Sequence, residues 1–248
     1  MGTKVFSNAQ ALLFINEIRY VILMVGEQIQ EIREISLTLV PVAHISQKSA
    51  QLVRKTIELE KPQLIGLELC RERFEGLAKK GPRTMDFGMM FAHPTSAVLF
   101  VVQQLIGKWW QVKPGTEMVE ALRTARDMGI PVALLDKPVR AISRDIERIP
   151  LKEKLGLVLS GGFNPFKQKM TLSQIMQPEN LQILLTKMRN EFPESYKVFV
   201  ESRNRYMFRK LLFHKPESAV VVMGAAHVPG FTKLAEESEQ KINVKIVG

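Results

Sequence analysis

The sequence predicts an α/β fold with a parallel-rich central sheet, helices on both faces and a helical insertion. Two observations support this prediction. Short apolar runs rich in β-branched residues occur at 37–43, 64–67, 132–135 and 219–223, and such runs are typical of strands buried on both faces of a sheet. Segments with helical periodicity separate the runs, and alternation of strands with helices is typical of parallel sheets.

The first half of the chain alternates as this fold requires. The strand at 37–43 precedes a helix that Ser46 or Ser49 caps and that runs to about Glu60. The strand at 64–67 and a helix at about 71–79 follow. After the insertion, a helix at about 116–128 ends at Gly129, where a helix C-terminus favours a left-handed residue.

The second half begins with the strand at 132–135 and continues with an all-helical pattern over 139–214. The strand at 219–223 then leads to a helix near 232–238 and a terminal strand at 243–247. Within the helical region we predict turns where proline or glycine occurs: Pro150, Gly161-Gly162, Pro178 and Pro193.

We expect one domain over residues 1–248, because no repeat and no long Pro/Gly/Ser linker occurs. Residues 1–34 have weak periodicity, with 20–25 as a candidate edge strand. The apolar insertion at 84–112 contains the tract 87–110, which His93-Pro94, Gln103-Gln104 and Lys108 interrupt. A membrane span needs about 20 mostly apolar residues, so we predict buried helices there, with an interfacial or partner-binding surface as the alternative.

Composition is that of a globular protein, with 46% hydrophobic and 24% charged residues among 248. The net charge is +10, but the basic residues are scattered, which does not favour nucleic acid as the partner. The single cysteine excludes an intramolecular disulfide and a zinc site made of several thiolates. Because the N-terminus lacks the order of a signal peptide, we expect a cytoplasmic protein without a membrane span; peripheral membrane contact and the oligomeric state stay open.

Each apolar run leads to a residue that can bind a metal or move a proton. These residues are His44, Glu68, Asp136 and His227. In parallel sheets, ligands bind beyond the carboxyl ends of the strands, where all four residues are expected. Two imidazoles and one carboxylate match the ligand count of a catalytic zinc-type site.

Each of these residues also has an ordinary structural interpretation. Either histidine could be held by a backbone partner at a strand end. Glu68 could pair with Arg71 or Arg73 instead of binding a metal or acting as a general base. Asp136 could cap the helix that follows it.

Two other features leave alternatives open. Arg203, Arg205 and Arg209 lie on one predicted helix, which could present a solvated face or a cluster that grips a carboxylate. Cys70 beside Arg71 could be a reactive thiolate.

Several motifs, in this order, resemble those of the TraB family, which includes pheromone-shutdown proteins and lies near the Tiki and GumN peptidase-like proteins. The resemblance extends from about residue 37 to residue 247. The motifs that carry it are Pro41-Val42-Ala43-His44-Ile45-Ser46, Glu68-Leu69-Cys70 with Arg73, Pro114-Gly115-Thr116-Glu117-Met118, Asp136-Lys137, Ser202-Arg203-Asn204-Arg205-Tyr206-Met207 and Gly224-Ala225-Ala226-His227-Val228-Pro229-Gly230.

The resemblance implies metal-dependent peptidase-like chemistry or control of a peptide signal. His44, His227 and Glu68 would hold one divalent ion such as Zn, Co or Mn, and the substrate would be a peptide or protein. The predicted catalytic residues are Glu68, Arg73, Asp136 and Arg203.

Four positions depart from the family pattern: Pro41 replaces a glycine, Cys70 and Asn204 replace carboxylates, and Lys137 replaces an arginine. These departures motivate the alternative of a catalytically inactive regulatory protein of the same fold that binds a peptide or partner.

Overall fold

The structure is a computed structural model that describes residues 34–42, 47–80, 116–159, 174 and 177–247. His44, the candidate edge strand at 20–25 and the apolar insertion at 84–112 lie outside these residues. The described residues all belong to one compact unit, Glu34–Gly248.

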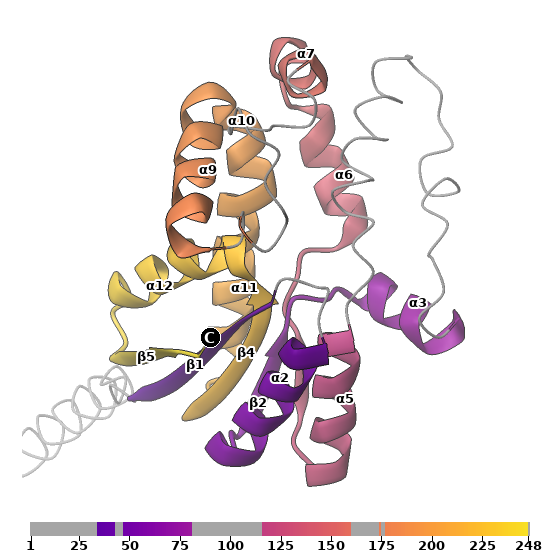
Figure 1. Ribbon diagram of the computed structural model, residues 1–248, viewed down its shortest axis with the longest axis vertical. Coiled ribbons are helices and arrows are strands. Elements are labelled where there is room, and N and C mark those ends of the chain that lie inside the picture. The colour runs from indigo at the N-terminus through magenta and orange to yellow at the C-terminus, as the bar shows by residue number, and fades with distance from the viewer. Residues whose placement is uncertain (1–33, 43–46, 81–115, 160–173, 175–176, 248) are drawn as a thin grey trace, which may run out of the picture. The chain divides into compact units, whose positions relative to one another are not determined.

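Five parallel strands form one sheet in the order β3-β2-β4-β1-β5, and Figure 1 shows it with helices against it. This arrangement confirms the predicted α/β class. The strands lie within about two residues of their predicted positions: β1 (Ile35–Val42), β2 (Leu64–Leu67), β3 (Val132–Leu134), β4 (Ser218–Gly224) and β5 (Ile242–Ile246).

Most helices also follow the predicted pattern. Before β3 they are α2 (Gln47–Glu60), α3 (Arg71–Lys80) and α5 (Thr116–Met128). Between β3 and β4 they are α6 (Val139–Glu147), α7 (Leu151–Leu159), α9 (Pro178–Glu191), α10 (Pro193–Tyr196), the π-helical turn η2 (Lys197–Glu201) and α11 (Ser202–Phe213). The 3₁₀ turn η3 (Ala225–His227) and α12 (Val228–Glu236) follow β4.

Three local predictions can be compared with this structure. Gly129 has φ of 69°, which confirms the left-handed residue after α5. The predicted turn at Pro178 is confirmed as a break between helices, because Gln177 has extended backbone and Pro178 is the first residue of α9, where its missing N–H has no helical partner to lose. The final helix begins at Val228 instead of near Thr232, because Pro229 is accommodated in its first turn.

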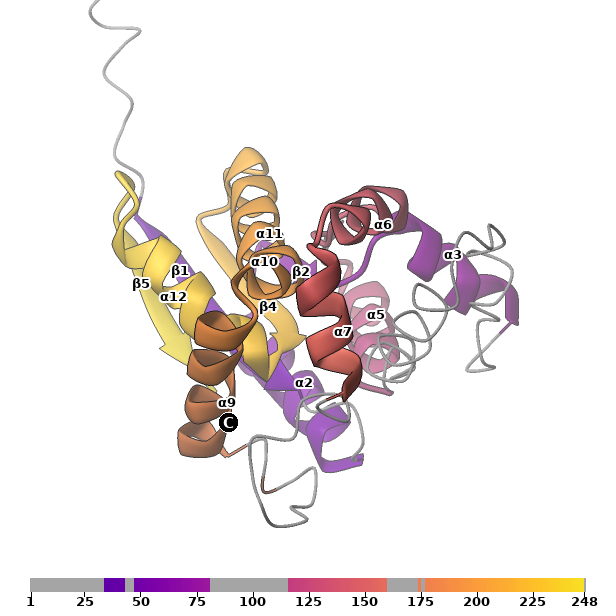
Figure 2. The same ribbon diagram turned by 90° about the horizontal axis from the view of Figure 1, so that it is seen from above.

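Both faces of the sheet are buried, as the continuous apolar strands predict. In β4, Val220 and Val222 point into a cluster with α2 and α5, whereas Val221 and Met223 point into a cluster with α11 and α12. Figures 1 and 2 show α2 and α5 next to each other. Alternate residues of one strand therefore contribute to separate cores.

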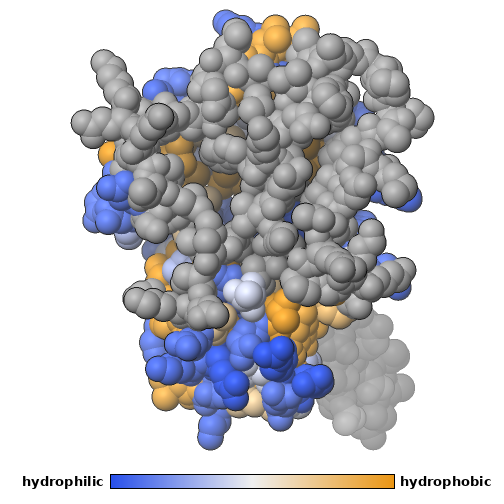
Figure 3. Space-filling view, turned by 45° about the vertical axis from the view of Figure 1, so that its right-hand side comes forward, coloured by the Kyte–Doolittle hydropathy of each residue, from blue (hydrophilic) through white to orange (hydrophobic). Residues whose placement is uncertain are grey.

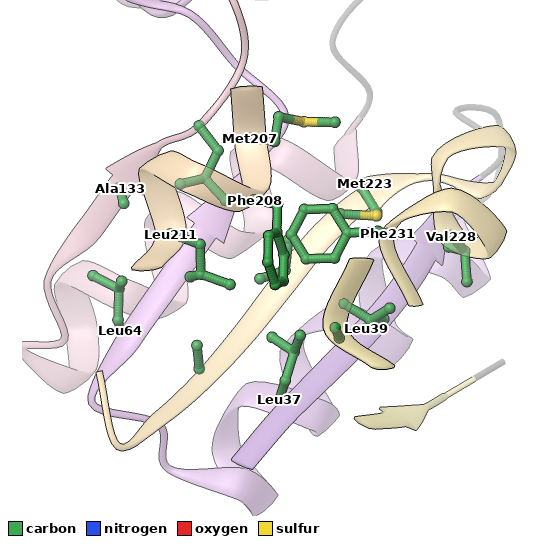
Figure 4. Close-up of a cluster of buried hydrophobic side chains, with 14 residues drawn as sticks. Leu37, Leu39, Leu64, Ala133, Met207, Phe208, Leu211, Met223, Val228 and Phe231 are labelled. Atoms are coloured by element: carbon green, nitrogen blue, oxygen red, sulfur yellow. The ribbon is translucent and has the colours of Figure 1, made fainter. Parts of the chain in front are cut away.

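Aromatic packing joins α11 and α12 on their face of the sheet. Phe208 and Phe231 meet edge to face, with ring centroids 5.3 Å apart and an interplanar angle of 82°. Figure 4 shows both rings above Leu37 and Leu39 of β1. This contact holds α11, which carries Arg203, against α12, which begins directly after His227.

A separate helical cluster is built from α7, α9 and α10. Its buried residues are Leu181, Leu184, Met188 and Phe192. The Glu153 carboxylate of α7 accepts hydrogen bonds from the backbone N–H groups of Glu194 and Ser195 at 3.2 and 2.9 Å, which satisfies donors at the start of α10.

The described surface is mixed in character. Figure 3 shows hydrophilic side chains gathered over the lower part of the described surface in that view, interspersed with apolar patches. No helix within the described ranges has the length and apolar character that a membrane span requires.

Candidate functional site

The carboxyl ends of β2, β3 and β4 bring three predicted site residues together. Glu68 follows β2 and donates its backbone N–H to Val222 O of β4 at 3.1 Å, so it continues the sheet beyond the last strand residue. Asp136 follows β3 and donates its N–H to Leu69 O at 3.1 Å. His227 lies in η3, three residues beyond the end of β4.

Arg203 of α11 occupies the centre of this group. Its Nε and Nη2 donate to the two carboxylate oxygens of Asp136 at 2.9 and 2.8 Å, which is a bidentate pair. Nη2 also donates to Glu68 Oε1 at 2.5 Å. Nη1 lies 3.0 Å from His227 Nε2. One guanidinium group therefore contacts all three residues that follow the strands.

All four side chains of this group are buried, which strengthens the electrostatic contacts among them. Asp136 is 1% exposed, His227 4%, Arg203 5% and Glu68 9%. Burial acts to lower the pKa of Arg203, but the carboxylates of Asp136 and Glu68 raise it above its usual value. The guanidinium consequently remains charged and serves as the internal counterion of both acids.

Glu68 is held as a carboxylate. Burial acts to raise the pKa of Glu68, whereas the neighbouring His227 and Arg203 lower it. The backbone N–H of Gly224, which donates to Oε2 at 2.6 Å, also favours the ionised form. Together these contacts hold the pKa of Glu68 well below its ordinary value, so the side chain is ionised at neutral pH.

The two ring nitrogens of His227 have different partners. Nδ1 lies 2.7 Å from Oδ1 of Asn204, the residue next to Arg203 on α11. Nε2 lies 3.0 Å from Arg203 Nη1 and 3.2 Å from Glu68 Oε1. The ring therefore presents Nε2 to the charged group and Nδ1 to the amide.

The two arginines nearest to Glu68 in the sequence differ in their contacts. Arg73 reaches the site through Asp136, because its Nη1 donates to Asp136 Oδ2 at 3.1 Å. Arg71 pairs with Glu75 on the surface of α3. The structure thus pairs Glu68 with Arg203 and His227 instead of with the two arginines nearest in sequence.

The three arginines that were predicted to lie on one helix differ in burial. Arg203 is buried and grips two carboxylates, whereas Arg205 and Arg209 are exposed. The carboxylate-gripping alternative therefore describes Arg203 and the solvated-face alternative describes the other two. A helix places these residues at different angles around its axis, so one run of basic residues divides between core and solvent.

Two further alternatives can now be decided. The capping alternative for Asp136 is wrong, because Pro138 is the N-cap of α6 and no side chain caps that helix. Asp136 instead accepts the backbone N–H of Lys137 at 2.8 Å and pairs with the two arginines. Cys70 is buried, and burial raises the pKa of its thiol, which makes a reactive thiolate wrong for this position.

Sequence reasoning missed two polar residues. Asn204 was noted only as a departure from the family pattern, yet it is 3% exposed and is the partner of His227. Glu117, in the first turn of α5, is fully buried, and neither of its carboxylate oxygens has a hydrogen-bond partner in the described part of the chain. Its place in the motif Pro114-Gly115-Thr116-Glu117-Met118 was the available signal.

Two atoms of this site have the spacing of two ligands of one divalent ion. Glu68 Oε1 and His227 Nε2 lie 3.2 Å apart, and two ligands of one tetrahedral zinc are about 3.3 Å apart when each bond is about 2.0–2.1 Å. Within the residues that the structure describes, no group of three His, Cys, Asp or Glu side chains could hold a metal. A third protein ligand would have to come from outside them, and His44 is the predicted one.

Comparison with known proteins gives two findings. The chain matches the model of the TraB/PrgY/gumN family over residues 31–244. It is also similar to an uncharacterized protein of Methanocaldococcus jannaschii, with 27% identity over 231 residues, which cover 87% of this chain and 57% of that relative. The chain spans little more than half the length of this curated relative. Because the family model covers most of its length, the chain belongs to the TraB/PrgY/gumN family.

Proposed function

We propose that this protein is a metal-dependent hydrolase that acts on peptides or on a peptide signal. The observation that carries the proposal is the 3.2 Å separation of Glu68 Oε1 and His227 Nε2 within a buried cluster of charged side chains at the carboxyl edge of the sheet. Family membership and the predicted third ligand His44 support the same site.

Glu68 and His227, together with His44, would hold the ion. A bound divalent ion supplies a water of lowered pKa and polarises the scissile carbonyl. Glu68 suits the role of ligand better than that of general base, because its depressed pKa keeps it ionised but makes it a weak proton acceptor at neutral pH.

Asp136 would keep Arg203 in place during turnover. Its bidentate bonds at 2.9 and 2.8 Å hold the guanidinium even when Glu68 Oε1 exchanges its bond to Nη2 for another partner. Nη1 and Nη2 would then face the reacting group as donors for an oxygen that gains negative charge. Arg73 would act through Asp136, because it donates to the same carboxylate.

A binding role without turnover is the second candidate. The observation that favours it is that Arg203 already contacts both Glu68 Oε1 and His227 Nε2, so an internal cation satisfies the two proposed ligands. In that case the buried ion pairs would serve as a rigid part of a protein that captures a peptide or partner.

Metal content and thermal unfolding of the purified protein test the proposal. Added Zn, Co or Mn should bind near one equivalent and raise the melting temperature. His44→Ala, His227→Ala and Glu68→Gln should each abolish this effect. His214→Ala is the matched control, because His214 is exposed at the end of α11 and should leave metal binding unchanged.

A peptide-library assay separates the two candidates. Cleavage that depends on added metal and disappears in Glu68→Gln supports the hydrolase. Metal binding without any cleavage supports the binding role. Metal content that is the same in wild type, His44→Ala and His227→Ala contradicts the metal site itself.

A further inference from the structure

Asn204 and Gly230 form a small packing unit behind His227. Asn204 comes from α11 and Gly230 from the first turn of α12, and both helices cover the same face of the sheet. Oδ1 of Asn204 lies 2.7 Å from Nδ1 of His227, and the asparagine is 3% exposed. The amide has therefore been taken out of water to meet the imidazole.

The contacts of the ring determine which nitrogen carries the fixed proton. The Oδ1 atom of Asn204 can only accept, so Nδ1 of His227 carries a proton. Nε2 lies between a donor, Arg203 Nη1 at 3.0 Å, and an acceptor, Glu68 Oε1 at 3.2 Å. In the neutral ring Nε2 therefore accepts from Arg203, and in the protonated ring it can donate to Glu68. In the protonated ring Nδ1 also carries a proton. In both states Nδ1–H donates to Asn204 Oδ1, and only Nε2 changes its proton.

The close approach of Asn204 depends on the absence of a side chain at Gly230. A Cβ placed on Gly230 would lie 2.2 Å from Asn204 Nδ2, a distance that real Cβ contacts essentially never show, so the amide would have to move. A glycine inside a helix costs about 1 kcal/mol relative to alanine. The space that the Asn204 amide needs explains why glycine occupies position 230 in spite of this cost.

We propose that Asn204, seated against Gly230, is a positioning residue that fixes the Nδ1–H form of His227 and directs Nε2 toward Glu68 and Arg203. A second hydrogen bond of this kind orients a histidine that binds a metal through its other nitrogen. The catalytic meaning of this role rests on the proposed function, whereas the position of the proton can be measured without it.

Nitrogen-15 NMR of the full chain, labelled at histidine, tests the proposal directly. At alkaline pH, where the rings are neutral, His227 should show a protonated Nδ1 and an unprotonated Nε2. Exposed His214 provides the internal reference, because free imidazole favours the proton on Nε2. A His227 proton on Nε2 in wild type overturns the proposal, and this reading needs no variant to fold.

Variants then test the two supporting residues. Asn204→Leu keeps the size but removes the acceptor, and it should lose the Nδ1–H form. Asn204→Asp should retain it, because a carboxylate also accepts. Gly230→Ala should lose the form by displacing the amide, whereas Lys233→Ala, at an exposed position of the same helix, should not. An unchanged tautomer in folded Asn204→Leu or Gly230→Ala overturns the proposal.

Metal affinity and turnover separate this inference from the proposed function. If the protein is a metal-dependent hydrolase, Asn204→Leu should lower metal affinity or turnover about 10- to 100-fold, with rescue by Asn204→Asp. If wild type neither binds metal nor cleaves peptides but keeps the Nδ1–H tautomer that Asn204→Leu loses, the positioning role stands and the proposed function fails.

Discussion

Replacing Arg203 by methionine is expected to lower the free energy of unfolding by about 3–5 kcal/mol at pH 7, because a buried charge pair loses one partner. The guanidinium makes three bonds to carboxylates, at 2.9 and 2.8 Å to Asp136 and at 2.5 Å to Glu68. Asp136 would keep only the bond from Arg73 and the local N–H of Lys137 among its described contacts.

The magnitude follows from what remains buried. Three bonds to charged groups at about 1.5–3 kcal/mol each give about 4.5–9 kcal/mol, but bonds that share one donor group are not additive. The apolar methionine also returns part of the loss through burial. An estimate of about 4 kcal/mol corresponds to a decrease of about 1–2 M in the urea midpoint for an m value of about 2–3 kcal/mol/M.

The pH dependence gives this prediction a second measurement. In the variant, burial still raises the pKa of Glu68 while the lowering effect of Arg203 is gone. His227 and the Gly224 N–H still lower the pKa of Glu68, but it is higher in the variant than in wild type, so the deficit of the variant relative to wild type is larger at pH 7 than at pH 4. Urea unfolding at both pH values measures this difference.

Arg209→Met is the matched control for Arg203→Met. Arg209 lies on the same helix but is exposed, so its replacement should change the stability by no more than about 0.5 kcal/mol. Equal effects of the two replacements at pH 7, or a deficit of Arg203→Met that is the same at both pH values, would refute the reasoning.

Three further predictions concern stability. The depressed pKa of Glu68 stabilises the folded state above about pH 4.3, its unfolded value, and this stability is lost as pH falls through the lower folded pKa. In an acid titration followed by circular dichroism, Glu68→Gln should therefore lose less stability than wild type, and equal curves for the two proteins would contradict the prediction. Glu117→Met removes two buried carboxylate oxygens that have no hydrogen-bond partner in the described residues, so urea unfolding should show a free energy of unfolding higher by about 1–3 kcal/mol. A lower free energy of unfolding would mean that Glu117 has a stabilising partner. Gly66→Ala would place a Cβ 2.6 Å from Leu135 Cδ1 and 3.0 Å from Val221 Cγ2, and this overpacking should cost about 1–3 kcal/mol and lower the melting temperature. An unchanged melting temperature would show that the Leu135 side chain can move aside without cost.

Much of the fold was predictable because local patterns determine it. Continuous apolar runs identified the buried strands, and their ends placed Glu68, Asp136 and His227 at one edge of the sheet. The strand order was not predictable, because β4 inserts between β1 and β2 although it comes much later in the chain. Order depends on how the crossovers pack, and no local pattern records that.

The site divides in the same way between sequence and tertiary structure. The sequence determined which chemical groups follow the strands, since strand length and hydrophobicity are local properties. Only the tertiary structure decided their partners: Arg203 reaches Glu68 across 135 positions, and Asn204 meets His227 against Gly230. A buried charge pairs with whichever group the packing of α11 and α12 brings within a few ångströms, because desolvation leaves it no partner in water.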